Sequence, residues 1–264
     1  MTVLVVDVSS HNPHPFDYAA VRNGGVGGAV VKLTEGADAA AYVNPYAAQD
    51  VAGFRAVGLP VAGYHFLHPT IPVADQLALL RAHLDHVAFV WVDSELVQGS
   101  WSSIAATTEA MCKAIQGAGI RAGLYSNLTF LGSMPGAPWG FPLWLADYGP
   151  AAPPRPCTMW QFTDAGAVSG IQGSVDLSHY YGTEAKLAAL FAPLALRHVP
   201  QLTEEDTVWL DTDPNNGAAI LVVPSLGGWY GLSEEKLAYY QGNGISEAKV
   251  KITLAVFNTL KKLG

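Results

Sequence analysis

The strongest constraint on the fold is a pattern that the first 192 residues repeat eight times. A short apolar run ends in polar or aromatic residues, and an alanine-rich amphipathic segment often follows it. Strands that alternate with helices predict a parallel sheet, and eight of them predict closure into a barrel. The apolar runs cover residues 3–7, 28–34, 60–65, 88–93, 121–126, 142–147, 158–162 and 174–177. The helix-like segments cover residues 45–56, 73–84, 103–116 and 183–191.

The later crossovers are too short for full helices. We therefore expect an α/β fold over residues 1–193, an irregular TIM-like (β/α) barrel. Half of the 264 residues are hydrophobic and 14% are charged, so the chain can bury a sizeable core.

The charge pattern excludes several classes of partner. The net charge is −8 and no basic run occurs, which argues against a nucleic-acid partner. No apolar stretch approaches the length of a membrane span, so we expect no membrane insertion. The N-terminus enters the first apolar run directly, so we expect no signal peptide. Cys112 and Cys157 form no metal-like cluster; we expect free thiols, although a disulfide stays open.

The fourth apolar run ends in two carboxylates separated by one residue, Asp93 and Glu95. Side chains alternate along a strand, so both should point to the same side. Two acids side by side at the end of a buried strand should have pKa values that are pushed apart. Acid-assisted bond cleavage needs such a pair. The alternative is a strand end that simply reaches solvent, and Trp91 of this run is expected in the core, on the face opposite the acids.

The carboxyl ends of the other runs test this interpretation, because barrel enzymes work at that end of their strands. Four carboxylates besides Glu35, and a ring of aromatic side chains, converge there. Flat aromatic faces with scattered hydrogen-bonding groups suit sugar rings. The pattern therefore favours a hydrolase that acts on a glycosidic bond. The residues at the strand ends are Asp7, Lys32, Glu35, Tyr64, His65, Asp93, Glu95, Tyr125, Trp144, Tyr148, Trp160, Gln161 and Asp176.

Residues 1 to about 190 resemble the glycoside hydrolase family 25 lysozymes of bacteriophage endolysins and of bacterial and fungal wall-degrading enzymes. The stretches that carry the resemblance include Val6-Asp7-Val8-Ser9, Val31-Lys32-Leu33-Thr34-Glu35-Gly36, Tyr42-Val43-Asn44-Pro45-Tyr46, Gly63-Tyr64-His65-Phe66, Val92-Asp93-Ser94-Glu95, Leu124-Tyr125-Ser126, Leu143-Trp144-Leu145-Ala146-Asp147-Tyr148, Trp160-Gln161-Phe162 and Val175-Asp176. The chain departs from the family pattern at His11-Asn12-Pro13 and at Ser178.

The resemblance implies a muramidase that hydrolyses the β-1,4 bond between N-acetylmuramic acid and N-acetylglucosamine in peptidoglycan glycan strands. In this reading Glu95 is the general acid. Asp93 stabilises the cation at the anomeric carbon or steers the substrate's acetamido group. Asp7 and Asp176 hold this pair or orient a water.

The substrate-binding candidates are Tyr64, Tyr125, Trp144, Tyr148, Lys32 and Gln161. The aromatic ones could instead be barrel packing, and Lys32 could be a counter-ion to the acids. His65 is expected to be a satisfied core histidine rather than a base. The histidines have no helix-spaced ligand set, so we expect no metal, and nothing indicates a cofactor.

The pattern changes after residue 193. Residues 194–202 read as a linker, and residues 203–264 as a small α+β module with strands near 207–210 and 218–224. Helices are expected near 234–240 and 247–262. Placed behind a wall hydrolase, the module is most simply a cell-wall binding unit that uses Trp229, Tyr230, Tyr239 and Tyr240. These aromatics could instead form its core or an oligomer interface.

Together these features predict a phage-type endolysin that stays in the host cytoplasm until lysis and then reaches the bacterial cell wall. Two alternatives stay open. One is a secreted bacterial muramidase for wall remodelling. The other is a catalytically inactive barrel that binds glycans, against which the intact set of four acids argues.

Overall fold

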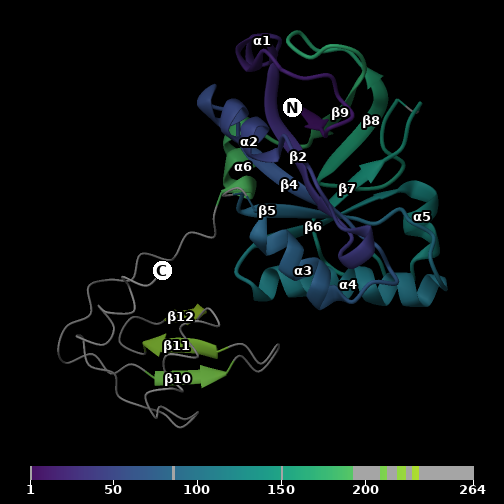
Figure 1. The fold of residues 1–264 in the computed structure, drawn as a ribbon, viewed down its shortest axis with the longest axis vertical. Helices are drawn as coiled ribbons and strands as arrows, with labels where there is room; N and C mark the ends of the chain where they lie inside the picture. Colours follow the sequence, from purple (N-terminus) through teal and green to yellow (C-terminus); the bar gives the residue numbers. More distant parts are fainter. Residues whose placement is uncertain are drawn as a thin grey trace. The chain divides into compact units, whose positions relative to one another are not determined.

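Eight strands close into a barrel in the computed structural model (Figure 1). The first strand pairs with both β2 and β9, which completes the ring. Each of the eight predicted apolar runs is one of these strands. They are β1 (Val3–Val8), β2 (Val26–Glu35), β4 (Val61–Phe66), β5 (Phe89–Asp93), β6 (Arg121–Asn127), β7 (Leu143–Ala146), β8 (Met159–Gly166) and β9 (Val175–Tyr180). A two-residue strand, β3 (Tyr42–Val43), pairs with the end of β2.

The structure describes residues 2–84, 87–149 and 151–192, together with the backbone of 209–212, 219–223 and 228–231. The chain divides into two compact units: the first comprises residues 1–116 and 120–193, and the second comprises residues 117–119 and 194–264.

One strand departs from the predicted parallel sheet. β9 runs antiparallel to both β1 and β8, whereas every other neighbouring pair in the ring is parallel. Only residues 167–174 separate β8 from β9, and a parallel crossover needs about a dozen residues or more. The all-parallel expectation is therefore wrong for this strand, because the connection is too short to return the chain to the other end.

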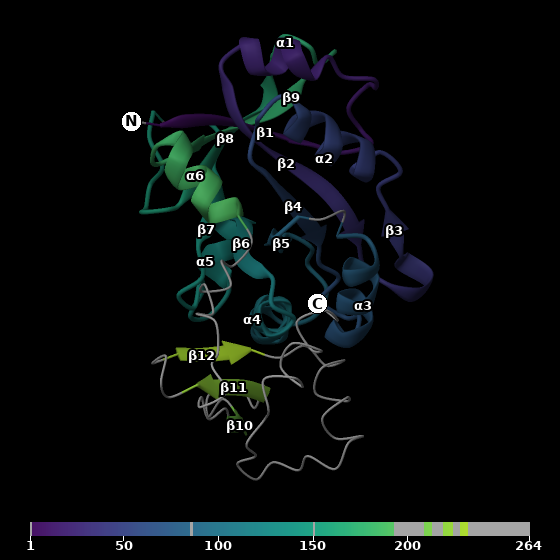
Figure 2. The same cartoon turned by 90° about the vertical axis from the view of Figure 1, so that its left-hand side faces the viewer.

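Four predicted helices are present with ends that agree within two residues, namely α2 (Ala47–Ala56), α3 (Val73–Ala82), α4 (Trp101–Gly117) and α6 (Glu184–Phe191). Two short helices, α1 (Tyr18–Asn23) and α5 (Leu128–Ser133), and the 3-10 turn η1 (Asp38–Ala40) were not predicted. α3 and α4 lie side by side outside the barrel (Figure 1, Figure 2). No described helix is long and apolar enough to cross a membrane.

Alternate residues of the strands fill the barrel interior. On β5 these are Phe89, Trp91 and Asp93, and the two aromatic rings pack in one cluster with Tyr125 and Trp144. The position of Trp91 in the core is as expected, but its predicted face is wrong. It lies an even number of residues from Asp93, so it occupies the same interior one layer below the acid.

The other end of the barrel is closed by α6. Its buried Leu187 and Phe191 pack in the interior cluster with Val3 and Phe89, and the rings of Phe89 and Phe191 lie 5.5 Å apart. Val3 and Phe89 begin their strands, so α6 seals the amino-terminal ends of β1 and β5.

The second unit contains a three-stranded antiparallel sheet, β10 (Trp209–Thr212), β11 (Ala219–Val223) and β12 (Gly228–Gly231). The first two strands overlap the predicted ones, and β12 carries Trp229 and Tyr230. Tyr239, Tyr240 and the two predicted helices lie outside the described residues.

Candidate active site

The predicted site residues meet at one end of the barrel, where the parallel strands have their carboxyl ends; Asp176 reaches the same level from the amino-terminal end of β9, because that strand is antiparallel. Strand register carries this directly: Lys32 is opposite Tyr64, Asp93 is opposite Tyr125, and Asp7 is opposite Asp176. Asp7 and Asp176, which are 169 positions apart along the chain, thus share one interior layer because the barrel closes between β1 and β9.

Gln161 of β8 joins two of the acids. Its Nε2 donates to Asp7 Oδ2 at 3.1 Å and to Asp176 Oδ2 at 3.0 Å. Its Oε1 accepts from the hydroxyls of Tyr125 and Tyr148, both at 2.8 Å. The side chain is 1% exposed, so it has no free surface for a ligand.

Asp7 and Asp176 face each other across the antiparallel β1–β9 pair and are hydrogen-bonded to one another. Burial raises the pKa of Asp7 well above its ordinary value, and repulsion from Asp176 adds to this. Asp176 is only half-buried. Burial also raises its pKa, and its hydrogen bonds to Asp7 and Gln161 oppose the rise. Two carboxylates in contact cannot both ionise comfortably.

Asp93 ends β5 and is buried. Its Oδ1 accepts no hydrogen bond from the described part of the protein. Burial raises the pKa of Asp93 well above its ordinary value, Glu95 adds to the rise, and the positive charge of Lys32 opposes it.

Glu95 follows the strand and is exposed at the mouth of the barrel. Its pKa is raised, first because neighbouring protein displaces water on the barrel side, and second because Asp176 is close; Lys32 again opposes the rise. The pKa values of Asp93 and Glu95 are therefore both raised, and burial is the largest cause for each.

Lys32 lies beside the acids but is bonded elsewhere. Its Nζ donates to Glu35 Oε2 at 2.6 Å. The same Nζ lies over three aromatic rings, at 5.3 Å from the centroid of Tyr42, 5.9 Å from Tyr64 and 5.1 Å from Phe66. These contacts hold a cation in a largely buried position.

Glu35 also contacts His68 Nε2 through its Oε1 at 3.1 Å. The hydrogen bond and charge of Lys32, with those of His68, lower the pKa of Glu35 against the effect of burial. Sequence reasoning placed Glu35 at a strand end but gave Tyr42, Phe66 and His68 no role in the site. The available signal was their place near strand ends, since Phe66 ends β4, His68 follows it by two residues and Tyr42 begins β3.

Two aromatic candidates differ in access. Tyr148 is 47% exposed, whereas Trp144 is 2% exposed and donates its Nε1–H to Ser178 Oγ at 3.0 Å. Trp144 is the register partner of Tyr125, and the two rings meet edge to face with centroids 4.5 Å apart. Its geometry is that of a packing residue, and the departure from the family pattern at Ser178 provides its hydrogen-bond partner.

His65 is fully buried between Thr34 Oγ1 at 2.8 Å and Gln76 Oε1 at 3.1 Å. Burial lowers its pKa to about 4, so the imidazole is neutral near pH 7. It is a satisfied core histidine.

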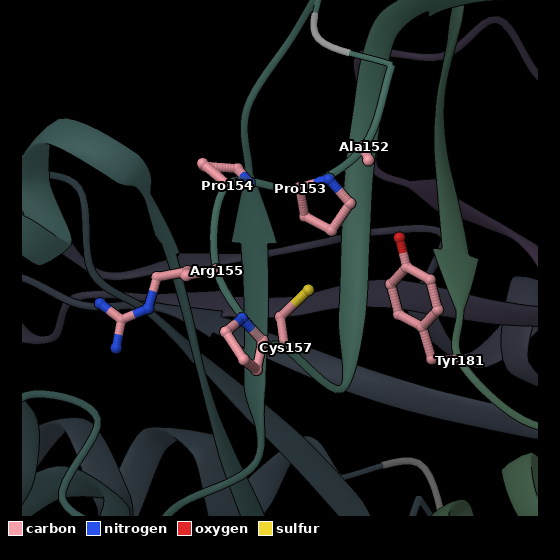
Figure 3. A pocket seen from close by; sticks show the side chains of 7 residues that line it. Ala152, Pro153, Pro154, Arg155, Cys157 and Tyr181 are labelled. Atoms are coloured by element: carbon pink, nitrogen blue, oxygen red, sulfur yellow. The ribbon is translucent and has the colours of Figure 1, made fainter.

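A separate pocket of about 480 Å³ lies away from these residues, lined by residues 152–157 and Tyr181 (Figure 3). Cys157 and Tyr181 face its space, while Arg155 points away from it (Figure 3). Burial raises the pKa of the Cys157 thiol to about 11, so it is not a reactive thiolate at neutral pH. None of the candidate site residues lines this pocket.

Comparisons with known proteins agree with the geometry. The sequence profile described as "Glycosyl hydrolases family 25" matches residues 6–171. An autolytic lysozyme of Clostridium acetobutylicum is 26% identical over 171 residues, which are 62% of this chain and 52% of that protein. The chain thus spans about half the length of this curated relative.

Solved structures share the barrel. A bacterial lysozyme from Streptomyces coelicolor aligns with a TM-score of 0.62 at 21% identity and covers 72% of this chain and 97% of its own. The catalytic domain of an endolysin from bacteriophage P40 of Listeria monocytogenes aligns with a TM-score of 0.59 at 22% identity, covering 71% and 98%. Because the family profile covers more than half of the chain, in the order that the barrel requires, the chain belongs to glycosyl hydrolases family 25.

Proposed function

We propose that the protein is a peptidoglycan hydrolase that cleaves the β-1,4 bond between N-acetylmuramic acid and N-acetylglucosamine. The observation that carries this is the gathering of Asp7, Asp93, Glu95 and Asp176 at one open end of a family 25 barrel. Cleavage of a glycosidic bond requires one carboxyl that donates a proton and another that stabilises positive charge.

The difference in exposure supports separate roles for the two acids on β5 and its extension. Glu95 is exposed at the mouth, so it can reach the leaving oxygen of a bound strand, whereas Asp93 is buried. A raised pKa keeps a proton on Glu95 to higher pH than usual, as a general acid needs.

Asp93 supports the developing charge from below. Its Oδ1 lacks a hydrogen-bond donor among the described residues, so its anion is poorly stabilised by the protein itself. Either a cation forming at the anomeric carbon or the N–H of the substrate's acetamido group would supply that stabilisation, and both roles remain in the proposal.

The rim offers a platform for sugars. The exposed ring of Tyr148 presents a flat apolar face, and Tyr64 with Lys32 lies deeper, beside Asp93. In the biological setting we place the enzyme with endolysins, held in the host cytoplasm until lysis. The likeness to the catalytic domain of a phage endolysin supports this. The 203–264 module would bind the wall.

The proposal predicts that Glu95→Gln folds and binds wall fragments but loses turnover at least about 100-fold, because the group that protonates the leaving oxygen is gone. Clearing of purified walls measures the rate, and mass spectrometry of the new reducing ends names the bond. Glu109→Gln is the matched control: Glu109 lies on α4 and pairs with Lys113 at 2.8 Å. Wild-type rates in Glu95→Gln, or reducing ends on N-acetylglucosamine, would contradict the proposal.

A further inference from the structure

The residue with the most complete set of contacts in the site is Gln161, which the sequence suggested as a substrate contact. All four hydrogen-bonding positions of its amide are used: two by Asp7 and Asp176, and two by Tyr125 and Tyr148. With 1% exposure, it has neither a free donor nor a free surface. Its effect on a substrate must pass through its partners.

The partners also fix which way the amide faces. A carboxylate only accepts hydrogen bonds, so the amide NH₂ must face Asp7 and Asp176. The two tyrosine hydroxyls must then donate to Oε1. Flipping the amide would set its oxygen against two acids, so the tyrosines hold the donors of Gln161 on the acid pair.

Asp7 and Asp176 together carry one negative charge, and that charge lies mainly on one of them. Asp7 is buried and Asp176 is half-exposed, and burial penalises a charge more strongly than exposure to the cleft does. The hydrogen bond between them raises the pKa of Asp7 and lowers that of Asp176. The proton therefore belongs on Asp7, and the negative charge on Asp176, nearer the mouth.

We propose that Gln161 is a positioning residue: with Tyr125 and Tyr148 it holds Asp7 and Asp176 as a pair that shares one proton, and the remaining charge on Asp176 keeps Glu95 protonated. The inference rests on the proposed function, in which Glu95 is the acid. Of the charges acting on Glu95, that of Asp176 is the largest.

Other charged groups act on the same cluster. Lys32 works against the proton on Glu95 and on Asp93. The negative charge of Asp164, which lies on β8, raises the pKa of Asp176. Tyr64 and Tyr148 are themselves held neutral, because burial and the surrounding carboxylates raise their pKa values. The hydrogen bonds of Gln161 therefore change only one of the charges that act on Glu95, namely that of Asp176, within a cluster that is acidic overall.

Gln161→Met tests the role, because Met keeps a similar volume and removes both donors. Without the donors the acid pair takes up a second proton more readily, so Glu95 loses its anionic neighbour. We expect kcat to fall about tenfold, as for loss of a hydrogen bond to a charged group, with KM unchanged. The alkaline limb of the pH–rate profile should move to lower pH.

Tyr148 allows a double-mutant cycle. Tyr148→Phe keeps the exposed ring and removes one hydrogen bond to Gln161, so kcat should fall a few-fold with KM unchanged. In the Gln161→Met background the same change should have no further effect, since its partner is gone. Tyr181→Phe is the matched control, because Tyr181 is 43% exposed against 47% for Tyr148 and lies at the separate pocket.

Gln76→Met controls for loss of stability alone. Gln76 is fully buried and bonded to the backbone of His68 and Ile71 and to His65, and within the described part of the chain it has no carboxylate partner. It should destabilise the fold without moving the pH profile. A raised KM with unchanged kcat in Gln161→Met, additive effects in the cycle, or an unmoved alkaline limb would each overturn the proposal.

A readout independent of turnover separates this inference from the proposed function. Carboxyl ¹³C titration of the full chain, with the Asp7 and Asp176 signals assigned by Asp→Asn variants, should show two well-separated steps for the pair. Gln161→Met should move both steps to higher pH, including the lower one, at which the pair takes up its second proton. Two independent, ordinary titrations in the wild type would overturn the shared proton even if the enzyme cleaves walls. A chain that shows both steps and no cleavage would instead refute the proposed function.

Discussion

Asp93 is a carboxyl group in a place that disfavours its charge. It is buried, one of its oxygens accepts no hydrogen bond from the described residues, and a second acid lies two positions along the chain. All of these favour the protonated form, and only Lys32 opposes them. A folded-state pKa above the unfolded value means that the group supports folding at low pH and opposes it as the pH rises.

Asp93→Asn should therefore stabilise the barrel at neutral pH while abolishing activity. The gain should be absent below about pH 3.9, where the unfolded aspartate is also protonated, and should grow as the pH rises above it. A gain of about 1 kcal/mol would raise Tm by roughly 2–4 °C in a domain of this size. Thermal unfolding of both chains between pH 3 and pH 8 measures it.

Asp75→Asn is the control for this experiment, because Asp75 is exposed in the first turn of α3. Asp75→Asn should be neutral or slightly destabilising, because the negative charge of an acid near the amino terminus of a helix is stabilised by the positive end of the helix dipole. If Asp93→Asn lowers Tm at neutral pH, the carboxylate is stabilised by the fold and the proposed conflict is absent.

The sequence is sufficient to find residues such as Asp7 and Asp93, because strand ends mark themselves by an abrupt change from apolar to charged. It is not sufficient to assign Gln161. The role of that residue depends on partners from β1, β6, β9 and the segment after β7, and no local pattern links them. Similarly, Trp144 and Tyr148 look alike in sequence, and only burial separates packing from exposure.

At the level of elements, the aromatic layer under the acids depends on a glycine. Trp91 on β5 is fully buried, and its neighbour on β6 is Gly123. A Cβ built on Gly123 would lie 2.4 Å from Trp91 Cζ3 and 2.9 Å from Phe89 Cζ. The indole can fill the barrel below Asp93 only because the facing residue has no side chain.

Gly123→Ala should destabilise the barrel by about 1–3 kcal/mol, the usual result of overpacking a core. Gly117→Ala is the matched control, because Gly117 ends α4 and a Cβ there meets nothing within 4 Å. It should be neutral or stabilising by up to about 1 kcal/mol, since alanine is the better helix former. Chemical unfolding measures both, and equal stability of the two variants would show that Trp91 can move aside.

The apolar runs predicted which segments are strands and which are long helices, but they did not predict the direction of β9 or the two short helices. The direction of β9 depends on the length of the β8–β9 connection. The pattern of apolar runs places the strand but does not give its direction. The helices α1 and α5 have six residues each, too few to show an amphipathic period. The face of β5 on which Trp91 lies could have been predicted from the sequence, because side chains alternate along a strand and Trp91 is two positions from Asp93.

For the whole molecule, the barrel is complete without the second unit. Every carboxylate of the site lies between Asp7 and Asp176, and α6 closes the amino-terminal ends of the strands by residue 191. Chemistry on a single glycan bond should therefore be separable from attachment to the wall, which the proposal assigns to residues 203–264.

A chain that ends at residue 193 should fold and cleave short soluble glycan strands with kcat/KM unchanged, because it keeps the acids and the α6 seal. Its clearing of intact walls should be several-fold slower, and it should no longer pellet with them. Trp229→Ala combined with Tyr230→Ala in the full chain should reproduce the loss of pelleting if β12 contacts the wall. Equal pelleting of long and short chains would mean that the barrel alone attaches to the wall. Loss of activity on the short strands would mean that the second unit contributes to the active site itself.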